Sequence, residues 1–326
     1  MLRKKIPHLA VVVLIGACSG STTTTVSATT TPPTTAPLAA TTTTGVTGNY
    51  PLTVEAANGS VVIDARPQAI VSISPTATEM LFAIGAGSQV VAVDSLSNYP
   101  PEAPVTDLAA FTPNTEAIAS YRPDLVIVSF DANELLAGLA ELQIPTLLMS
   151  AAVTIEDVYT QIEQLGVATD HVAEAAELVG QLSTDLEGIA SAAPRPVEPL
   201  TYYYELDPNN FFSVTSTTFV GSVLATLGLQ NIADPADADG SAFGYPQLSA
   251  EFIVAADPDL ILLADTKCCD QNAAAVAARP GWAGLTAVTS GGVVELDDDV
   301  ASRWGPRIVD LLEAVAQRVA ELVPAP

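Results

Sequence analysis

The chain has 326 residues, enough for two domains of ordinary size, and its 37 acidic residues far outnumber its 11 lysines and arginines. A surface this acidic repels nucleic acid and anionic lipid, so we expect no nucleic-acid partner. Three of the basic residues, Arg3, Lys4 and Lys5, lie together at the start of the chain.

Residues 1–17 have the features of a secretion signal. An apolar segment from Ile6 to Ala17 follows the basic residues, is too short to span a bilayer as a stable helix, and ends in small residues directly before Cys18. This pattern resembles a bacterial lipobox, which implies that Cys18 is lipidated and anchors the protein to the outer face of the cytoplasmic membrane. The alternative is an ordinary signal peptide with a cysteine there by chance.

Residues 18–50 are predicted to be a disordered tether. They are rich in Thr, Pro and Ala and carry no charge. Such a segment cannot bury enough apolar surface to offset the entropy of folding. Its root-mean-square reach is roughly 30 Å, which separates the folded part from the membrane without fixing its orientation.

Residues 51–169 are predicted to form an N-terminal α/β lobe. Apolar runs indicate a hairpin over 52–64, strands over 69–73, 90–93 and 146–149, and helices that begin at Ser74 and near Glu134. Pro75 lies at a first-turn position, and Thr76 with Glu79 forms a capping-box pattern. Strands that alternate with helices are typical of a parallel sheet covered on both faces.

Residues 170–193 are predicted to be one long helix between two lobes, because apolar residues recur there at intervals of three and four. Residues 194–326 repeat the alternation, with strands over 200–205 and 292–296 and helices over 219–227 and 306–323. The predicted fold class is α/β, with two Rossmann-like lobes of parallel-rich sheets joined by one rigid helix.

One pattern occurs twice, at 114–129 and at 249–264, with a constant offset of 135 residues. Each copy has a glutamate, a short helical pattern, Pro-Asp and an apolar strand, which suggests two similar lobes. Glu116 and Glu251 lie in the first turn of the two predicted helices, where the helix dipole stabilises a carboxylate by ~0.3–1 kcal/mol. Two matching acids, one per lobe, would also suit docking onto a partner with two matching cations.

Ligands of open α/β sheets gather at the carboxyl ends of the strands. Five loops lie there by prediction: 74–76, 129–131, 205–212, 266–270 and 297–304. The only histidines are His8 and His171, outside these loops, so a histidine-built zinc site and a Ser-His-Asp triad are excluded and no catalytic residue or cofactor is assigned. A carboxylate pair such as Glu205 with Asp299 leaves an extracellular hydrolase as an alternative from another class.

Two short motifs in these loops have several interpretations. The run Asp297–Asp299 could hold a hard cation, but no spaced set of oxygen ligands surrounds it, so no metal site is predicted. Cys268 and Cys269 could form a vicinal disulfide in an oxidising compartment, remain two free thiols, or act as a soft ligand for a bound metal. The disulfide is favoured.

Several motifs together resemble the periplasmic binding proteins of iron-siderophore and vitamin B12 ABC importers. They are Ile73-Ser-Pro75…Thr78-Glu79, Ser97-Asn-Tyr99-Pro100-Pro101, both copies of the repeat, Tyr245-Pro246-Gln247-Leu-Ser249 and Arg303…Pro306-Arg307. The resemblance implies two α/β lobes joined by a long helix, and a monomer that binds its ligand between the lobes. It also implies that Glu116 and Glu251 engage arginines of a permease dimer, which works with a cytoplasmic ATPase.

The vitamin B12-binding branch is the most similar by pattern. It matches here at Phe111, Tyr245, Asp299 and Arg303, whereas two of its ligand-facing aromatics are replaced by Leu96 and Ser129. We therefore predict that the chain binds cobalamin or a related corrinoid, with a ferric siderophore or haem as the alternative ligands. The predicted ligand-binding residues are Ser74, Pro75, Tyr99, Phe111, Glu205, Phe212, Tyr245, Asp299, Arg303 and Trp304.

Overall fold

The computed structural model describes residues 50–323, which belong to a single compact unit. The predicted signal peptide, the lipidation site Cys18 and residues 18–49 of the predicted tether lie outside the described residues. Between Tyr50 and Val323, no helix combines the length and the apolar character that crossing a membrane requires.

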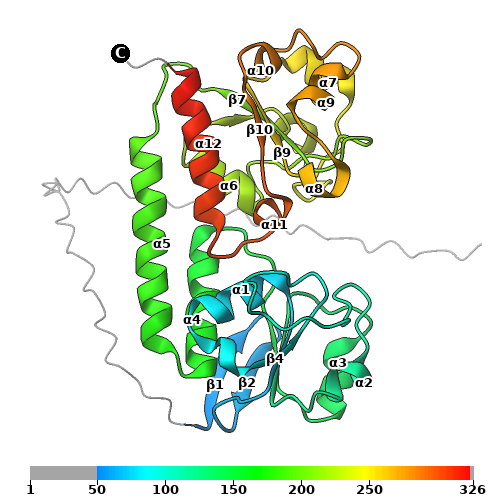
Figure 1. The fold of residues 1–326 in the computed structure, drawn as a ribbon, viewed down its shortest axis with the longest axis vertical. Helices are drawn as coiled ribbons and strands as arrows, with labels where there is room; N and C mark the ends of the chain where they lie inside the picture. The colour runs from blue at the N-terminus through cyan, green and yellow to red at the C-terminus, as the bar shows by residue number, and fades with distance from the viewer. Residues whose placement is uncertain (1–49, 324–326) are drawn as a thin grey trace, which may run out of the picture. The chain divides into compact units, whose positions relative to one another are not determined.

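The N-terminal lobe, the lower one in Figure 1, is built on a parallel sheet of four strands in the order β4-β3-β5-β6. An antiparallel hairpin precedes it in the chain. The strands are β1 (Leu52–Ala56), β2 (Gly59–Ile63), β3 (Ile70–Ile73), β4 (Val90–Val93), β5 (Leu125–Val128) and β6 (Thr146–Leu148), and the helical segments are α1 (Pro75–Ala83), η1 (Ala86–Gln89), α2 (Thr115–Ala119) and α3 (Leu135–Glu141).

The C-terminal lobe has a second parallel sheet, in the order β10-β9-β7-β8. Its strands are β7 (Thr201–Glu205), β8 (Gln230–Asn231), β9 (Leu260–Leu263) and β10 (Val293–Glu295), and its helical segments are α6 (Phe219–Ala225), η2 (Asp234–Asp237), α7 (Ala250–Ala256), α8 (Thr266–Cys269), α9 (Ala273–Ala278), α10 (Thr286–Thr289), α11 (Asp298–Ala301) and α12 (Ile308–Leu322).

The two main sheets share one topology. In each, the second strand of the sheet in chain order lies at an edge beside the first, and the third and fourth follow on the other side. The duplicated sequence pattern supplies the third strand of each sheet, β5 and β9, and both strands are buried along their whole length. The repeat thus marks equivalent elements of two similar lobes, and the α/β fold class is confirmed.

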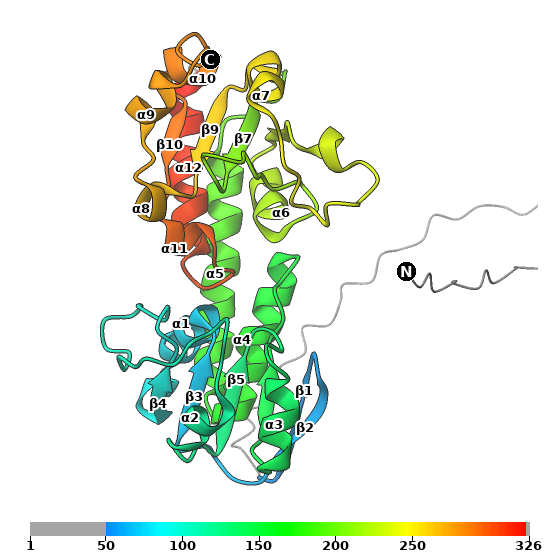
Figure 2. The same cartoon turned by 90° about the vertical axis from the view of Figure 1, so that its right-hand side faces the viewer.

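Two helices follow the last strand of the N-terminal sheet, and only one of them is predicted from the sequence. Helix α5 (Val172–Ala192) is the predicted long helix, whereas α4 (Ile155–Thr169) is not predicted. Asp170 adopts a left-handed conformation and turns the chain between them. Helix α5 runs along both lobes, beside α4 in the first lobe and α12 in the second (Figures 1 and 2).

A continuous apolar core crosses from one lobe to the other through these helices. It includes Leu165 of α4, Leu182 of α5 and Leu312 of α12, all buried, together with strand residues of both sheets. Each fully buried leucine contributes about 1.5–3 kcal/mol relative to an exposed one. Because the apolar contacts are shared, the helices hold the lobes as one packed body.

Candidate ligand site between the lobes

A cavity of about 600 Å³ lies where the carboxyl ends of the N-terminal strands meet the loop around α11 of the other lobe. Its lining combines residues that follow β3, β4, β5 and β6 with residues of the second lobe. They are Ser74, Pro75, Thr76, Ser95, Leu96, Asn98, Ala110, Phe111, Ser129, Phe130, Ala151, Asp299, Ser302, Arg303 and Trp304. This is the edge at which parallel sheets place their ligands.

A smaller cavity of about 180 Å³ adjoins the first and shares Ala151 and the segment Ser302–Trp304 with it. The other lining residues come mainly from the C-terminal lobe and are mostly apolar or aromatic. They are Ala152, Tyr204, Leu206, Val214, Thr218, Phe219, Val220, Tyr245 and Ala301. Trp304 therefore lines both cavities.

The structure brings together most of the predicted ligand residues. Ser74, Pro75, Phe111, Asp299, Arg303 and Trp304 line the larger cavity, and Tyr245 lines the smaller one. Tyr99 lines a different groove, where the Arg307 guanidinium lies 4.2 Å from its ring centroid. Phe212 is 39% exposed but lines neither cavity.

Aromatic side chains form one wall of the larger cavity. The rings of Phe111 and Phe130 lie 5.8 Å apart, and their exposed fractions are 70% and 41%. Trp304 forms part of the opposite lobe's surface, and its indole N–H donates to Gln161 Oε1 of α4 at 2.9 Å. Phe130 and Gln161 are absent from the sequence prediction, because nothing in the sequence distinguishes them from ordinary loop and helix residues.

Not every cavity residue is free to bind a ligand through its polar atoms. Ser74 is buried, and its hydroxyl caps α1 by accepting a hydrogen bond from the Ala77 N–H at 3.2 Å. This is the usual function of a serine at a helix N-terminus. Of Ser74 and Pro75, Pro75 is the more accessible.

The charged residues of the cavity are paired with each other. Arg303 donates to Asp299 Oδ1 at 2.9 Å and to Glu79 Oε1 at 2.7 Å. Burial alone would raise the pKa of Asp299, but hydrogen bonds from Lys267 and Asn98 and the charge of Arg303 hold it below its ordinary value. The cavity therefore presents a compensated pair of charges.

The prediction that Glu205 contacts the ligand needs correction. Its side chain is fully buried and lines neither cavity, and both of its carboxylate oxygens accept hydrogen bonds from Arg279. A desolvated carboxylate is stable only when it is paired in this way. Arg279 lies 74 residues away in the sequence, so no local pattern reveals the pair.

The acidic run Asp297–Asp299 near α11 is also paired with a cation of the protein. The Lys267 ammonium lies 2.8 Å from Asp297 Oδ1 and 2.9 Å from Asp299 Oδ2. Among residues 50–323, no group of three or more His, Cys, Asp or Glu side chains is arranged to hold a metal ion.

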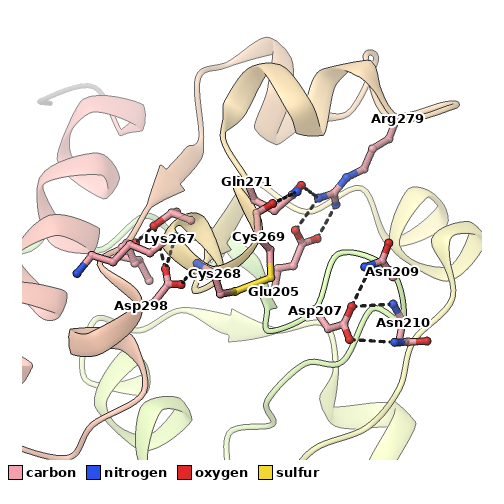
Figure 3. The surroundings of a disulfide bond; sticks show 12 residues. Glu205, Asp207, Asn209, Asn210, Lys267, Cys268, Cys269, Gln271, Arg279 and Asp298 are labelled. Carbon is pink, nitrogen blue, oxygen red and sulfur yellow. Dashed lines mark hydrogen bonds and ion pairs between the residues drawn. A yellow bond between two sulfur atoms is a disulfide. The ribbon is translucent and has the colours of Figure 1, made fainter. Parts of the chain in front are cut away.

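Cys268 and Cys269 are joined in a disulfide within α8 (Figure 3). Asp298 holds one side of this helix, where it accepts from the Cys268 N–H at 2.8 Å. On the other side Gln271 donates to the Cys269 carbonyl and accepts from Arg279. Hydrogen bonds to the backbone of the two cysteines thus link the acidic run to the buried ion pair, and neither cysteine lines an interlobe cavity.

The two repeated glutamates occupy equivalent places. Glu116 lies in the first turn of α2 and Glu251 in the first turn of α7, and both are exposed. Asn114 and Ser249 cap these helices through their side chains, so neither glutamate is needed as the cap. In the described part of the chain, neither carboxylate forms a hydrogen bond or an ion pair.

Comparisons with known proteins agree with this architecture. Residues 70–300 match the family described as periplasmic binding protein. An uncharacterized ABC transporter substrate-binding lipoprotein of Bacillus subtilis, YvrC, is 30% identical over 279 residues, which cover 83% of this chain and 86% of that protein.

Solved structures of periplasmic binding proteins also match this chain in fold. The vitamin B12 binding protein BtuF of Vibrio cholerae matches with a TM-score of 0.65 and 27% identity, covering 78% of this chain and 97% of that one. The heme-binding protein RhuT of Roseiflexus matches in fold with a TM-score of 0.68 and 24% identity, covering 78% and 99%. The chain therefore belongs to the periplasmic binding protein family of ABC transporter substrate-binding proteins.

Proposed function

We propose that this protein captures cobalamin or a related corrinoid between its lobes and delivers it to an ABC permease. The observation that carries the proposal is the interlobe cavity, which has aromatic and apolar walls and charges that are already paired. Such a site suits a bulky ligand without net charge, since an anionic ligand would find no uncompensated cation there. The similarity to BtuF supports the same ligand.

A ferric siderophore or haem is the alternative ligand. Haem deserves testing because a heme-binding protein shares this fold. Haem iron is usually held by His, Cys, Met or Tyr. Two tyrosines line the smaller cavity, but Tyr204 donates its hydroxyl to the Ala301 carbonyl at 2.9 Å. Tyr245 is then the side chain in the two cavities that could reach haem iron.

The alternative as a hydrolase has little geometric support. Glu205 is held by Arg279 away from the cavities, and Asp299 is held by Lys267, Asn98 and Arg303. Neither carboxylate is poised to transfer a proton to a substrate, and the two do not face one space.

The rest of the proposal concerns how the protein is attached and which partner it meets. Lipidated Cys18 would anchor it to the outer face of the cytoplasmic membrane, with the tether between anchor and lobes. Glu116 and Glu251 would present one carboxylate per lobe to the permease dimer.

Calorimetric titration tests the ligand. Protein lacking residues 1–43, which retains the whole compact unit, should bind cyanocobalamin with a dissociation constant in the micromolar range or below. Phe111→Ala should weaken binding about tenfold, because it removes aromatic surface from the cavity wall. Phe243→Ala is the matched control, since Phe243 is 87% exposed and lines neither cavity. Heat with a ferric hydroxamate or haem and none with cyanocobalamin would reject the corrinoid.

A further inference from the structure

Glu79 of α1 lies at the junction of the two lobes. It is 3% exposed, and its carboxylate accepts hydrogen bonds from two arginines of the C-terminal lobe. Arg303 reaches Oε1 at 2.7 Å, and Arg307 reaches Oε1 at 2.6 Å and Oε2 at 2.9 Å. One buried anion of the first lobe is therefore in contact with two cations of the second.

Arg303 uses its remaining donors on other partners. Its Nη2 donates to the Leu96 carbonyl at 2.9 Å, to Asn98 Oδ1 at 3.0 Å and to Asp299 Oδ1 at 2.9 Å. Arg303 lines the larger cavity, yet it is only 8% exposed. It is thus the cation nearest the ligand space, and its charge is balanced before any ligand arrives.

The balance depends on Glu79 in particular. Arg303 is paired with Glu79 and Asp299, and Arg307 is paired with Glu79. Asp94 and Asp310 interact with Arg303 and Arg307 through their charges without forming an ion pair with them. Lys267 is bound to Asp297 and Asp299 at the edge of this group. Loss of the Glu79 carboxylate would make the net charge around Arg303 more positive by one unit, at the wall of a partly desolvated cavity where charges act strongly on one another.

We propose that Glu79 determines the ligand charge that the cavity accepts. The carboxylate neutralises the arginine pair and thereby selects uncharged ligands against anionic ones, although it does not itself line the larger cavity. Glu79 is a specificity-determining residue that acts through Arg303. The inference rests on the proposed binding of a corrinoid between the lobes.

Corrinoids that share one shape and differ in charge provide the test. Cyanocobalamin is neutral, aquocobalamin in mildly acidic buffer is cationic, and the carboxylates made by hydrolysing peripheral amides of cyanocobalamin are anionic. The ratio of their dissociation constants within one variant is the readout. Because loss of stability affects all three ligands alike, the ratio reports charge selection alone.

Glu79→Gln should shift the ratio toward the anionic corrinoids by about tenfold or more, the effect of one uncompensated charge near the ligand. Arg307→Gln should shift it in the opposite direction, toward aquocobalamin, because Glu79 then keeps Arg303 as its one paired cation and the local net charge becomes more negative. The 18% exposed side chain of Arg307 makes this second variant the safer one for folding. Glu141→Gln, an equal charge change at an exposed residue of α3, should leave the ratio unchanged.

Unchanged ratios in both Glu79→Gln and Arg307→Gln would overturn the inference and leave Glu79 a purely structural ion pair. If the wild-type protein bound none of the corrinoids, the proposed function would fail instead. The same variants would then be titrated with a neutral ferric trihydroxamate and an anionic ferric tris-catecholate. A shift toward the catecholate in Glu79→Gln would support charge selection by Glu79, and equal loss of both would refute it.

Discussion

Asp265, in the C-terminal lobe, shows how a single residue can make the stability of the protein depend on pH. It is fully buried in the short connection between β9 and α8, and neither carboxyl oxygen has a hydrogen-bond partner among the described residues. Burial, together with the neighbouring charge of Glu205, raises the pKa of Asp265 to about 7. The folded protein therefore holds a proton on Asp265 that the unfolded chain releases near pH 4.

The sign of the resulting pH dependence follows from linkage. A raised carboxyl pKa contributes stability that is fully present below about pH 4 and is lost as the pH rises through about 7. Asp265→Asn should remove this contribution, which has a slope of at most ~1.4 kcal/mol per pH unit. Urea unfolding of both proteins between about pH 4.5 and about pH 8 measures this contribution, because this range covers the interval between the unfolded and folded pKa values of Asp265.

Asp64→Asn, at an exposed position, serves as the control for the general titration of an acidic protein. The difference in unfolding free energy between wild type and Asp265→Asn should change with pH, and that between wild type and Asp64→Asn should stay nearly constant. Parallel pH profiles for wild type and Asp265→Asn would show that Asp265 is ionised in the folded state throughout.

At the scale of elements, local patterns predict the strands and α5 well, because their apolar residues recur with a clear period. Helix α4 is missed although Thr154 and Asp157 form a capping box at its start. Its buried residues Val158, Ile162 and Leu165 recur at intervals of four and three, so the sequence does carry a helical signal there. What no local pattern shows is how closely α4 packs on α5: an added Cβ at Gly166 would lie 2.5 Å from the Ala175 Cβ. Contacts of that kind are not encoded in a periodic pattern.

The glycines of these two helices give a matched pair of predictions. Gly180 and Gly188 lie on the exposed side of α5, where an added Cβ meets no atom within 4 Å. Replacing either by alanine should raise the free energy of unfolding by about 0.5–1 kcal/mol, because alanine loses less backbone entropy in a helix. Gly166→Ala in α4 should instead destabilise the protein, since α4 and α5 would have to separate.

Urea unfolding of the three alanine variants checks these expectations, with cyanocobalamin affinity measured alongside. The α5 variants should retain wild-type affinity, because neither glycine lines a cavity. A destabilised Gly180→Ala or Gly188→Ala would mean that α5 is packed against something at its outer face or bends there during function.

For the whole molecule, the duplicated pattern predicts equivalent positions in two lobes, and the matching strand order confirms the equivalence. The site between the lobes is less predictable. Glu79 and Arg303 are 224 residues apart, and their contact depends on how α4, α5 and α12 hold the lobes together. Likewise, the tendency of ligands to bind at the carboxyl ends of parallel strands locates the loops around the cavity. It cannot show that the Glu205 side chain is buried and paired with Arg279.

The equivalence of the lobes leads to a prediction about docking. Glu116 and Glu251 are exposed, and other side chains cap their helices, so replacing both by alanine should cost no more than the ~0.3–1 kcal/mol of helix-dipole stabilisation at each site. Affinity for the ligand should be unchanged, because neither residue lines a cavity. Uptake of labelled cyanocobalamin by cells that carry the variant in place of the wild-type protein should be lost.

Each single variant should retain part of the uptake, since one lobe can still engage the permease. Glu141→Ala with Glu198→Ala removes the same charge from exposed positions of both halves of the chain and should transport normally, which separates specific docking from long-range attraction. Normal uptake by Glu116→Ala with Glu251→Ala would contradict the docking role. Parallel losses of stability, affinity and uptake would instead assign the two glutamates to helix stabilisation. The repeated pattern would then reflect the similar fold of the two lobes and would not mark a docking surface.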